Sequence, residues 1–454
     1  MTTRLVSASL RRTLRPQAIV SPAQTLFTPS PAPRLATRSP VLGLGTTNRA
    51  MSTTAQPLRP AADPADDITE SYGGAANVAH LRRVARDFRT DTITMPTDAQ
   101  VAYAAQASRG DDVEGEDPTT TALEERIARL AGKEAALLCL SATMCNALAV
   151  RSHLMQPPHS IIVDARAHTF KNEVGGAALF SQATSHALTP RNGLYLVRED
   201  IEERLELGND VHIAPTRLIM LEDTLNGVVV PTEEVERIAA LAGEHGILLH
   251  VDGARVWNSA AAAIERSGGV QDDAALGTAL ASILAPYSTA SLCLSKGLGA
   301  PLGSALVGPK NVIDRARWFR KAFGGAWRQS GHVAAQADWA ITHHFPRLAQ
   351  THKLARRLAD ELRAAGCTIL APVDTNMVFF DAAPLGLSFN KLKAALAVLD
   401  EPITLGSNRL VVHHQTSPKA VADLVETIKS LAGSVSEEEK AKVRSQKPAE
   451  LGYR

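Results

Sequence analysis

Apolar runs alternate with amphipathic stretches through the middle of the chain. Runs of five to seven mostly apolar residues occupy 134–140, 161–165, 218–223, 247–253, 291–295 and 304–308. Helical patterns separate them, as in 231–246, where Thr232 stands at a helix-capping position and Gly246 closes the stretch. Buried strands joined by helices are typical of the α/β class with a mainly parallel sheet.

The pattern changes near residue 335. A long amphipathic stretch reaches Gly366, two shorter apolar strands follow at 376–381 and 409–414, and a closing helix begins at Ser417. We predict a large domain over 61–335, a smaller C-terminal α+β domain over 336–432 and a charged tail over 433–454. No internal repeat is visible.

Residues 1–60 differ in composition from the remainder. They are rich in serine, threonine and proline, no acidic residue precedes Asp63, and arginines recur at Arg4, Arg11, Arg12, Arg15, Arg34, Arg38 and Arg49. This composition is typical of a mitochondrial transit peptide, and a merely disordered basic extension is the alternative. Met51 offers a start for a shorter form. We therefore predict a leader over 1–60 and a location in the mitochondrial matrix or the cytoplasm.

Charge and cysteine content exclude several classes of function. The formal net charge of +1 gives no reason to expect nucleic acid or an anionic membrane as partner. No apolar run is long enough to span a bilayer. The four cysteines are too few and too scattered for a disulfide framework or a zinc cluster, so we expect no metal and a reducing compartment.

Polar residues follow several of the predicted strands. Lys296 follows 291–295, Asp252 and Arg255 follow or end 247–253, His168 follows 161–165, and Ser141 and Thr143 follow 134–140. The carboxyl ends of parallel strands meet at one edge of a sheet, which is where ligands bind in open α/β folds. We expect these side chains to lie close together.

Lys296 favours a cofactor that carries an aldehyde. Burying an ammonium group is costly, whereas a lysine held neutral is a nucleophile toward an aldehyde. Pyridoxal 5'-phosphate supplies an aldehyde, and its ring nitrogen needs an acidic partner, for which Asp252 is suitably placed. Its phosphate needs a helix N-terminus with small and hydroxyl residues, as at Ser141, Ala142 and Thr143. His168 would stack on the ring.

Each of these residues also has an ordinary explanation. A lysine at a strand end is usually solvated, Asp252 before a glycine suits a turn, and Ser141 or Thr143 can be helix caps. A lone histidine such as His168 is more often structural than catalytic. The glycine-rich segment 297–303 lacks dinucleotide-loop spacing. Their common order along one sheet favours the cofactor interpretation.

Longer motifs identify a family. They are FRTDTITMPTDA (88–99), GDDVEGEDPTTTALEERIARLAGKEAALL (110–138), HVDGARVWNSA (250–260), CLSKGLGAPLGSALVG (293–308), RKAFGGAWRQSG (320–331) and, more loosely, NRLVVHH (408–414). Together they resemble the low-specificity L-threonine aldolases in a fungal-like form. The resemblance implies a pyridoxal-phosphate enzyme of fold type I with a seven-stranded-type sheet. It also implies cleavage of L-threonine, L-allo-threonine and other L-3-hydroxy amino acids to glycine and an aldehyde, by a homodimer or homotetramer.

The resemblance also implies roles for individual residues. Lys296 would hold the cofactor covalently, Asp252 would pair with its ring nitrogen and His168 would stack on the ring, with Lys296 and His168 catalytic. Arg255 would contact the phenolic oxygen of the cofactor or the substrate carboxylate. The phosphate would be bound by the Ala142 backbone and Thr143, helped by Lys321 and Arg328 of the same or a neighbouring subunit. Arg409 would clamp the substrate carboxylate, assisted by Thr90.

Four positions depart from the family pattern. Leu225 stands where histidine is frequent, Glu114 where tyrosine is, Ala142 where glycine is, and Asn172 where an aromatic residue or histidine is. The general base therefore stays open between His168, a phosphate-bound water and a water held by Glu114. A racemase resembling alanine racemase or a β-eliminating lyase on the same scaffold is the nearest alternative. A silent scaffold protein and a nicotinamide dehydrogenase are more distant ones.

Overall fold

The larger of two sheets has seven strands. The computed structural model describes residues 71–445, so the predicted leader over 1–60 lies outside the described residues. The strand order is β1-β7-β6-β5-β4-β2-β3. The strands are β1 (Ala135–Cys139), β2 (Ser160–Asp164), β3 (Thr184–Leu188), β4 (Thr216–Glu222), β5 (Leu248–Gly253), β6 (Thr289–Cys293) and β7 (Ser304–Gly308).

The sheet is mainly parallel, with one reversed strand. β3, β2, β4, β5 and β6 run parallel, whereas β7 is antiparallel to both β6 and β1. All six predicted strands are present within one or two residues of their predicted bounds. β3 was not predicted because its residues are polar and incompletely buried, as edge strands often are.

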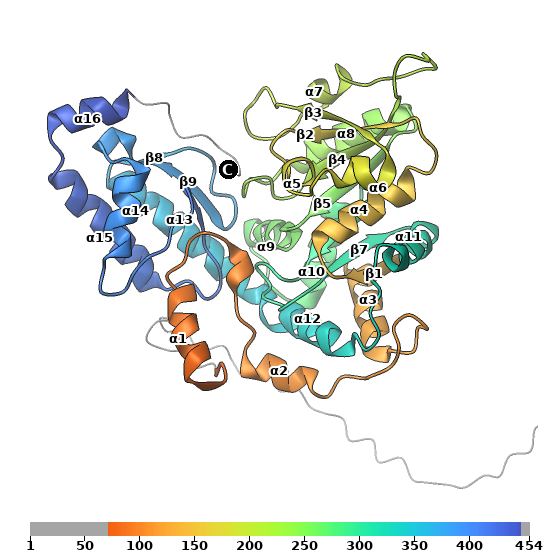
Figure 1. Cartoon of the computed structure of the whole chain (residues 1–454), viewed down its shortest axis with the longest axis horizontal. Helices are drawn as coiled ribbons and strands as arrows, with labels where there is room; N and C mark the ends of the chain where they lie inside the picture. The colour runs from red at the N-terminus through yellow and green to blue at the C-terminus, as the bar shows by residue number, and fades with distance from the viewer. Residues whose placement is uncertain (1–70, 446–454) are drawn as a thin grey trace, which may run out of the picture. The chain divides into compact units, whose positions relative to one another are not determined.

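Helices cover both faces of this sheet (Figure 1). Neighbouring strand residues face opposite sides, so Leu138 joins the core formed with α3, α8, α9, α10 and α12, while Leu137 joins the core formed with α4 and α11. The bounds of these helices are α3 (Pro118–Leu130), α4 (Ala142–His153), α8 (Thr232–Glu244), α9 (Val256–Arg266), α10 (Asp273–Leu284), α11 (Lys310–Ala322) and α12 (Gly331–His343).

The predicted cap of α8 was wrong by one residue. Pro231 occupies the N-cap position and Thr232 is the first helical residue, without a side-chain capping bond. Proline pre-sets the backbone for a helix entry, and Glu233 and Glu234 in the first turn favour the positive helix end. Gly246, at φ +62°, follows the helix as expected.

A second, antiparallel sheet has its own core. It orders β10 (Arg409–Val411), β9 (Met377–Asp381) and β8 (Thr368–Ile369), and α13 (Leu348–Ala364), α14 (Phe389–Ala397) and α15 (Pro418–Gly433) pack on it. Phe88 is fully buried in this core, where its N–H donates to Thr404 O (3.0 Å) and its carbonyl accepts from Val411 N (2.9 Å). The segment leading to Thr90 is therefore anchored in the second core.

The remaining helices and turns complete the described part of the chain. They are α1 (Gly74–Val84), α2 (Asp98–Ala104), α5 (His168–Lys171), α6 (Gly176–Ser181), α7 (Arg198–Glu202), α16 (Glu437–Arg444) and the 3-10 turns η1 (Asp91–Ile93), η2 (Phe345–Arg347) and η3 (Ala383–Leu385). Among residues 71–445, none of the helices combines the length and apolarity needed to cross a membrane.

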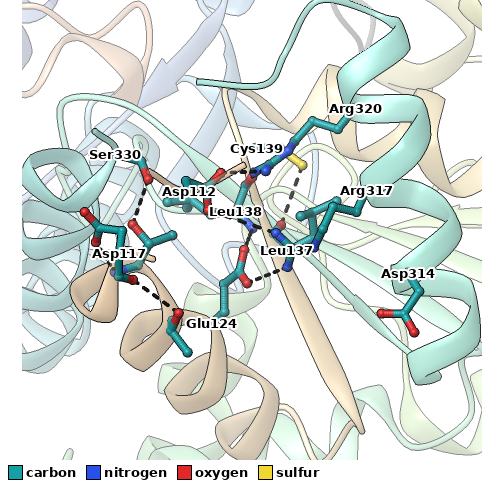
Figure 2. A network of polar contacts seen from close by, with 12 residues as sticks. Asp112, Asp117, Glu124, Leu137, Leu138, Cys139, Asp314, Arg317, Arg320 and Ser330 are labelled. Atoms are coloured by element: carbon teal, nitrogen blue, oxygen red, sulfur yellow. Dashed lines mark hydrogen bonds and ion pairs between the residues drawn. The ribbon is translucent and has the colours of Figure 1, made fainter. Parts of the chain in front are cut away.

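Helix α11 is joined to β1 and to the loop before α3 by buried charges (Figure 2). The Arg320 guanidinium is 1% exposed and donates to Leu138 O (2.7 Å) and Asp112 Oδ2 (2.5 Å). One turn earlier, Arg317 pairs with Glu124 (2.7 Å), whose other oxygen accepts from Leu138 N (2.7 Å). Two arginines three residues apart thus bind the end of β1 and the Asp112 loop to the same helix.

We predict that Arg320→Met lowers the free energy of unfolding by about 3 kcal/mol, because it leaves the buried Asp112 carboxylate without its closest counter-charge. Urea unfolding followed by circular dichroism measures the change. Lys310→Met, which breaks an exposed ion pair with Asp314 on the same helix, should change it by less than about 1 kcal/mol. Equal losses in the two variants would contradict the importance of this buried pair.

Candidate active site

Three side chains meet at the carboxyl edge of the parallel strands. His168, on α5 after β2, Glu173 and Asp252, near the end of β5, each place a ligand-type atom within 4.8 Å of the others. The sheet register adds a fourth polar group, since Glu222 at the end of β4 pairs with Asp252. The expected proximity of His168 and Asp252 is therefore observed.

Asp252 is 1% exposed, and both of its carboxylate oxygens accept hydrogen bonds. Oδ2 accepts from Asn146 Nδ2 (2.9 Å) and Oδ1 accepts from Ala254 N (3.0 Å), while the Ser291 hydroxyl lies 3.4 Å from Oδ1. An amide N–H therefore reaches each carboxylate oxygen, so Asp252 is arranged as an acceptor.

Lys296 lies in the connection between β6 and β7. Because β7 reverses direction, this connection returns at the carboxyl edge of β6 and brings the half-buried lysine to the other polar groups. Within residues 71–445, no carboxylate lies within ion-pair distance of its Nζ, although Lys296 acts electrostatically on Asp91, His168 and Glu222. The amine is thus close to charges without being bonded to one of the described side chains.

Hydrogen bonds join His168, at the start of α5, to Glu222, at the end of β4, and to Glu173. The Glu222 side chain accepts from His168 N (2.7 Å), and His168 Nδ1 lies 3.0 Å from Glu173 Oε1. The hydrogen bond with Glu173 raises the pKa of His168. Burial, reinforced by the nearby Asp252 charge, raises the pKa of Glu222 to about 8. Glu222 therefore carries a proton at neutral pH.

Helix α4 offers an anion-binding end at the same edge. Ser141 caps it, with Oγ accepting from Met144 N (3.2 Å). The N–H groups of Ala142 and Thr143 have no acceptor in the part of the chain that the structure describes, and the Thr143 side chain is exposed. Two unfilled N–H groups, a hydroxyl and the positive end of a 12-residue helix suit a phosphate.

Arg255 is already engaged by a buried carboxylate. Its Nε and Nη2 donate to the two oxygens of Asp91 (2.9 and 2.7 Å), and both side chains are at most 3% exposed. Burial alone would raise the pKa of Asp91, but the charge and hydrogen bonds of Arg255 outweigh it and lower that pKa to about 2. Thr90 caps the adjoining turn, with Oγ1 accepting from Thr92 N (3.3 Å).

The other predicted site residues lie in two places. Arg409, on β10, is half-buried and donates to Arg89 O (3.3 Å), beside Thr90. Lys321 and Arg328 are exposed, and Arg328 forms an ion pair with Asp111 (2.8 Å), outside the cluster formed by His168, Glu173 and Asp252. A role for these two in phosphate binding stays a prediction.

The positions that depart from the family pattern are also placed. Leu225 is 3% exposed and pairs with Val228, so its side chain belongs to the interior. Glu114 and Asn172 are exposed. A water held by Glu114 would lie in an exposed turn.

The sequence matches the family described as "Beta-eliminating lyase" over residues 87–384. The chain belongs to this family. Among similar proteins, the low specificity L-threonine aldolase of Saccharomyces cerevisiae is 45% identical over 65% of this chain and 74% of its own length. The low-specificity L-threonine aldolase of Candida albicans is 39% identical over 75% and 88%. Alanine racemase TOXG of Cochliobolus carbonum is 32% identical over 75% and 86%.

Solved structures agree on the fold of this beta-eliminating lyase family member. Threonine aldolase of Leishmania major superposes with a TM-score of 0.64 at 20% identity, covering 76% of this chain and 99% of that one. Serine palmitoyltransferase of Sphingomonas wittichii superposes with a TM-score of 0.57 at 17% identity, covering 77% of this chain and 88% of that one. These likenesses confirm the predicted type I fold.

Family membership also confirms pyridoxal phosphate as the cofactor, and the residues fit it. Among residues 71–445, no carboxylate bonds to the Lys296 amine and no acceptor fills the first N–H groups of α4, and Asp252 is a buried acceptor. Lys296, Asp252, His168, Ala142 and Thr143 are therefore the residues that would hold it.

Sequence reasoning missed Glu222, Glu173, Asn146 and Asp91. Glu222 obeys the same rule as Asp252, since it ends a parallel strand, and it could have been found. Asn146 lies one turn after Thr143 on α4, a spacing that places both on one helix face. Glu173 follows a short irregular helix and gave no periodic signal.

We predict that Glu222→Gln changes the pH dependence of stability. The carboxyl has a pKa of about 8 when folded against 4.5 ordinarily, so between these values the unfolded chain binds fewer protons than the folded one. The wild type then loses stability as pH rises from about 5 to 8, and the glutamine variant avoids that loss. The melting temperature of the variant minus that of the wild type should rise across this range in the cofactor-free proteins, measured by calorimetry. The exposed Glu233→Gln is the control, and a pH-independent difference for Glu222→Gln would contradict the assignment.

Proposed function

We propose that this protein cleaves L-threonine, L-allo-threonine and other L-3-hydroxy amino acids to glycine and an aldehyde. The observation that carries the proposal is the position of the Lys296 amine at the carboxyl edge of the sheet, near the half-buried His168 and the buried Asp252. No carboxylate of the described residues is bonded to this amine. The aldolase names of relatives at 39% and 45% identity support it.

Residues of this chain would bind the cofactor and the amino acid as follows. Lys296 holds the cofactor, Asp252 accepts a hydrogen bond from its ring nitrogen, and the α4 N-terminus takes its phosphate. When bound, pyridoxal phosphate supplies a ring that accepts the electron pair released at the substrate's Cα. Arg409 binds the substrate carboxylate with its planar guanidinium, next to Thr90. That grip sets which bond at Cα is aligned for cleavage.

Cleavage also requires a group that removes the proton of the substrate hydroxyl. Of the side chains weighed for this task, His168 is supported by its position beside Asp252 and Glu173. When the Nδ1–H group of a neutral His168 donates a hydrogen bond to Glu173, Nε2 is the ring nitrogen that carries no proton and can act as a base. Glu114 is exposed in a turn and receives no support from its position in a single chain.

A site shared between subunits fits the positions of Lys321 and Arg328. Both are exposed cations, and large apolar side chains are exposed at Trp318 (79%) and Leu179 (69%). We infer a homodimer or homotetramer. The arginine-rich residues 1–60 support a mitochondrial address, and Met51 supports a cytoplasmic form.

A racemase is the second candidate. Alanine racemase TOXG is similar over most of both chains, and Leu225 places an apolar side chain where the aldolase pattern often has histidine. A racemase exchanges the proton on Cα and leaves the Cα–Cβ bond intact. Product analysis separates the two candidates.

We predict that the purified protein, supplied with pyridoxal phosphate, releases acetaldehyde and glycine from L-threonine and L-allo-threonine. Lys296→Ala should lose the cofactor's yellow colour and at least about 10³-fold in kcat, because the covalent anchor is gone. Lys310→Ala, an exposed lysine, is the matched control. Racemised alanine without acetaldehyde would replace the aldolase with the racemase.

We predict that Arg409→Ala lowers kcat/KM for L-threonine by about 100-fold, mainly through KM, because a charge-assisted bond to the carboxylate is lost. Binding of pyridoxal phosphate should stay unchanged. The exposed Arg357→Ala serves as control. An Arg409→Ala enzyme with the parent's KM would move the carboxylate clamp elsewhere.

A further inference from the structure

The side-chain amide of Asn146 connects four groups beneath the proposed cofactor site. Asn146 is 1% exposed, and its Nδ2 donates to Asp252 Oδ2 (2.9 Å) and Glu173 Oε1 (2.9 Å). Its Oδ1 accepts from Ser291 Oγ (2.9 Å) and lies 3.1 Å from His250 Nε2. Two carboxylate oxygens on one side require the NH₂ group there, so its neighbours determine the orientation of the amide.

The contacts continue away from the site through two histidines. His250 Nδ1 lies 2.8 Å from Thr289 Oγ1, which lies 2.8 Å from His153 Nε2. Burial lowers the pKa of His250 to about 3 and that of His153 to about 4, so both rings are neutral at neutral pH. Neither histidine is therefore a counter-charge for Asp252.

The hydrogen bonds that link His153, Thr289, His250, Asn146 and Asp252 in series all run in one direction. Asn146 Oδ1 can only accept, so His250 carries its proton on Nε2 and its Nδ1 accepts from the Thr289 hydroxyl. That hydroxyl in turn accepts from His153 Nε2. Each donor thus points toward Asp252, and aligned hydrogen bonds of this kind strengthen one another in a buried setting.

We propose that Asn146 and His250, with Thr289 and His153 behind them, are positioning residues that hold Asp252 oriented as the hydrogen-bond acceptor for the cofactor's ring nitrogen. The same amide also holds Glu173, which bonds to His168. One asparagine therefore supports both the ring-nitrogen partner and the residue expected on the ring face. The inference rests on the proposed function only in taking pyridoxal phosphate as the ligand of Asp252.

The test uses the holoenzyme and two readouts other than turnover. These are the dissociation constant of pyridoxal phosphate, titrated into protein stripped of it, and the visible absorption maximum of the bound cofactor, which responds to the charge beside its ring nitrogen. His250→Leu should raise the dissociation constant about tenfold and move the absorption maximum. His250→Gln, which keeps an N–H for Asn146, should restore most of both.

Thr289→Val covers the case in which His250→Leu does not fold. The change is nearly isosteric and removes the hydroxyl from which His250 Nδ1 accepts, so both readouts should move in the same direction by a smaller factor. His159→Leu is the matched control, because His159 is 2% exposed and bonded to Ser181 O (2.7 Å) at the opposite end of β2. It should lower the melting temperature and leave both cofactor readouts unchanged.

Wild-type values of both readouts in His250→Leu and Thr289→Val would overturn the proposal and leave the chain of hydrogen bonds as ordinary core structure. The aldolase assignment fails by a different result, namely a wild type that binds pyridoxal phosphate normally and yet forms no acetaldehyde. In that case the cofactor readouts still decide the role of Asn146 and His250.

Discussion

A carboxylate buried at the end of β5 is the constraint on which the site depends. An isolated charge in the interior is expensive, so Asp252 requires donors from several elements at once. Asn146 comes from α4 and Ala254 from the turn after β5, and Ser291 of β6 donates to the amide oxygen of Asn146. The strand order β6-β5-β4 and the packing of α4 on the sheet bring these donors together. The site is therefore a property of the whole large sheet.

The same constraint recurs around the sheet's rim. Asp91 is buried against Arg255, and Asp112 against Arg320, in each case with an arginine whose planar group makes two contacts. Glu222 is different, since no arginine or lysine among the described residues lies within ion-pair distance, and its carboxyl retains a proton instead. The Arg255 partner thus lowers the pKa of Asp91, whereas burial without such a partner raises the pKa of Glu222.

Much of this arrangement was predictable from the sequence. Apolar runs ended at Lys296 and Asp252, and the carboxyl-edge rule placed them together with His168. The remainder could not be predicted, because it depends on contacts between elements. Asn146 reads as an ordinary helix residue until α4 is docked, no sequence pattern pairs Arg255 with Asp91, and β3 is too polar to be read as a strand. The contact of Arg255 with the cofactor or the substrate stays a prediction. The domain boundaries near residues 335 and 432, and the roles of Lys321 and Arg328, stay predictions.

Phe88 has a consequence for how the two sheets are joined. Its backbone is hydrogen-bonded to Thr404 and to Val411 of β10, so the segment that carries Thr90 lies against the strand that carries Arg409. Asp91, one residue after Thr90, is bonded to Arg255, which follows β5 of the large sheet. The same carboxylate accepts from Asn376 Nδ2 (3.2 Å) beside β9, so one buried side chain ties this segment to both sheets at once.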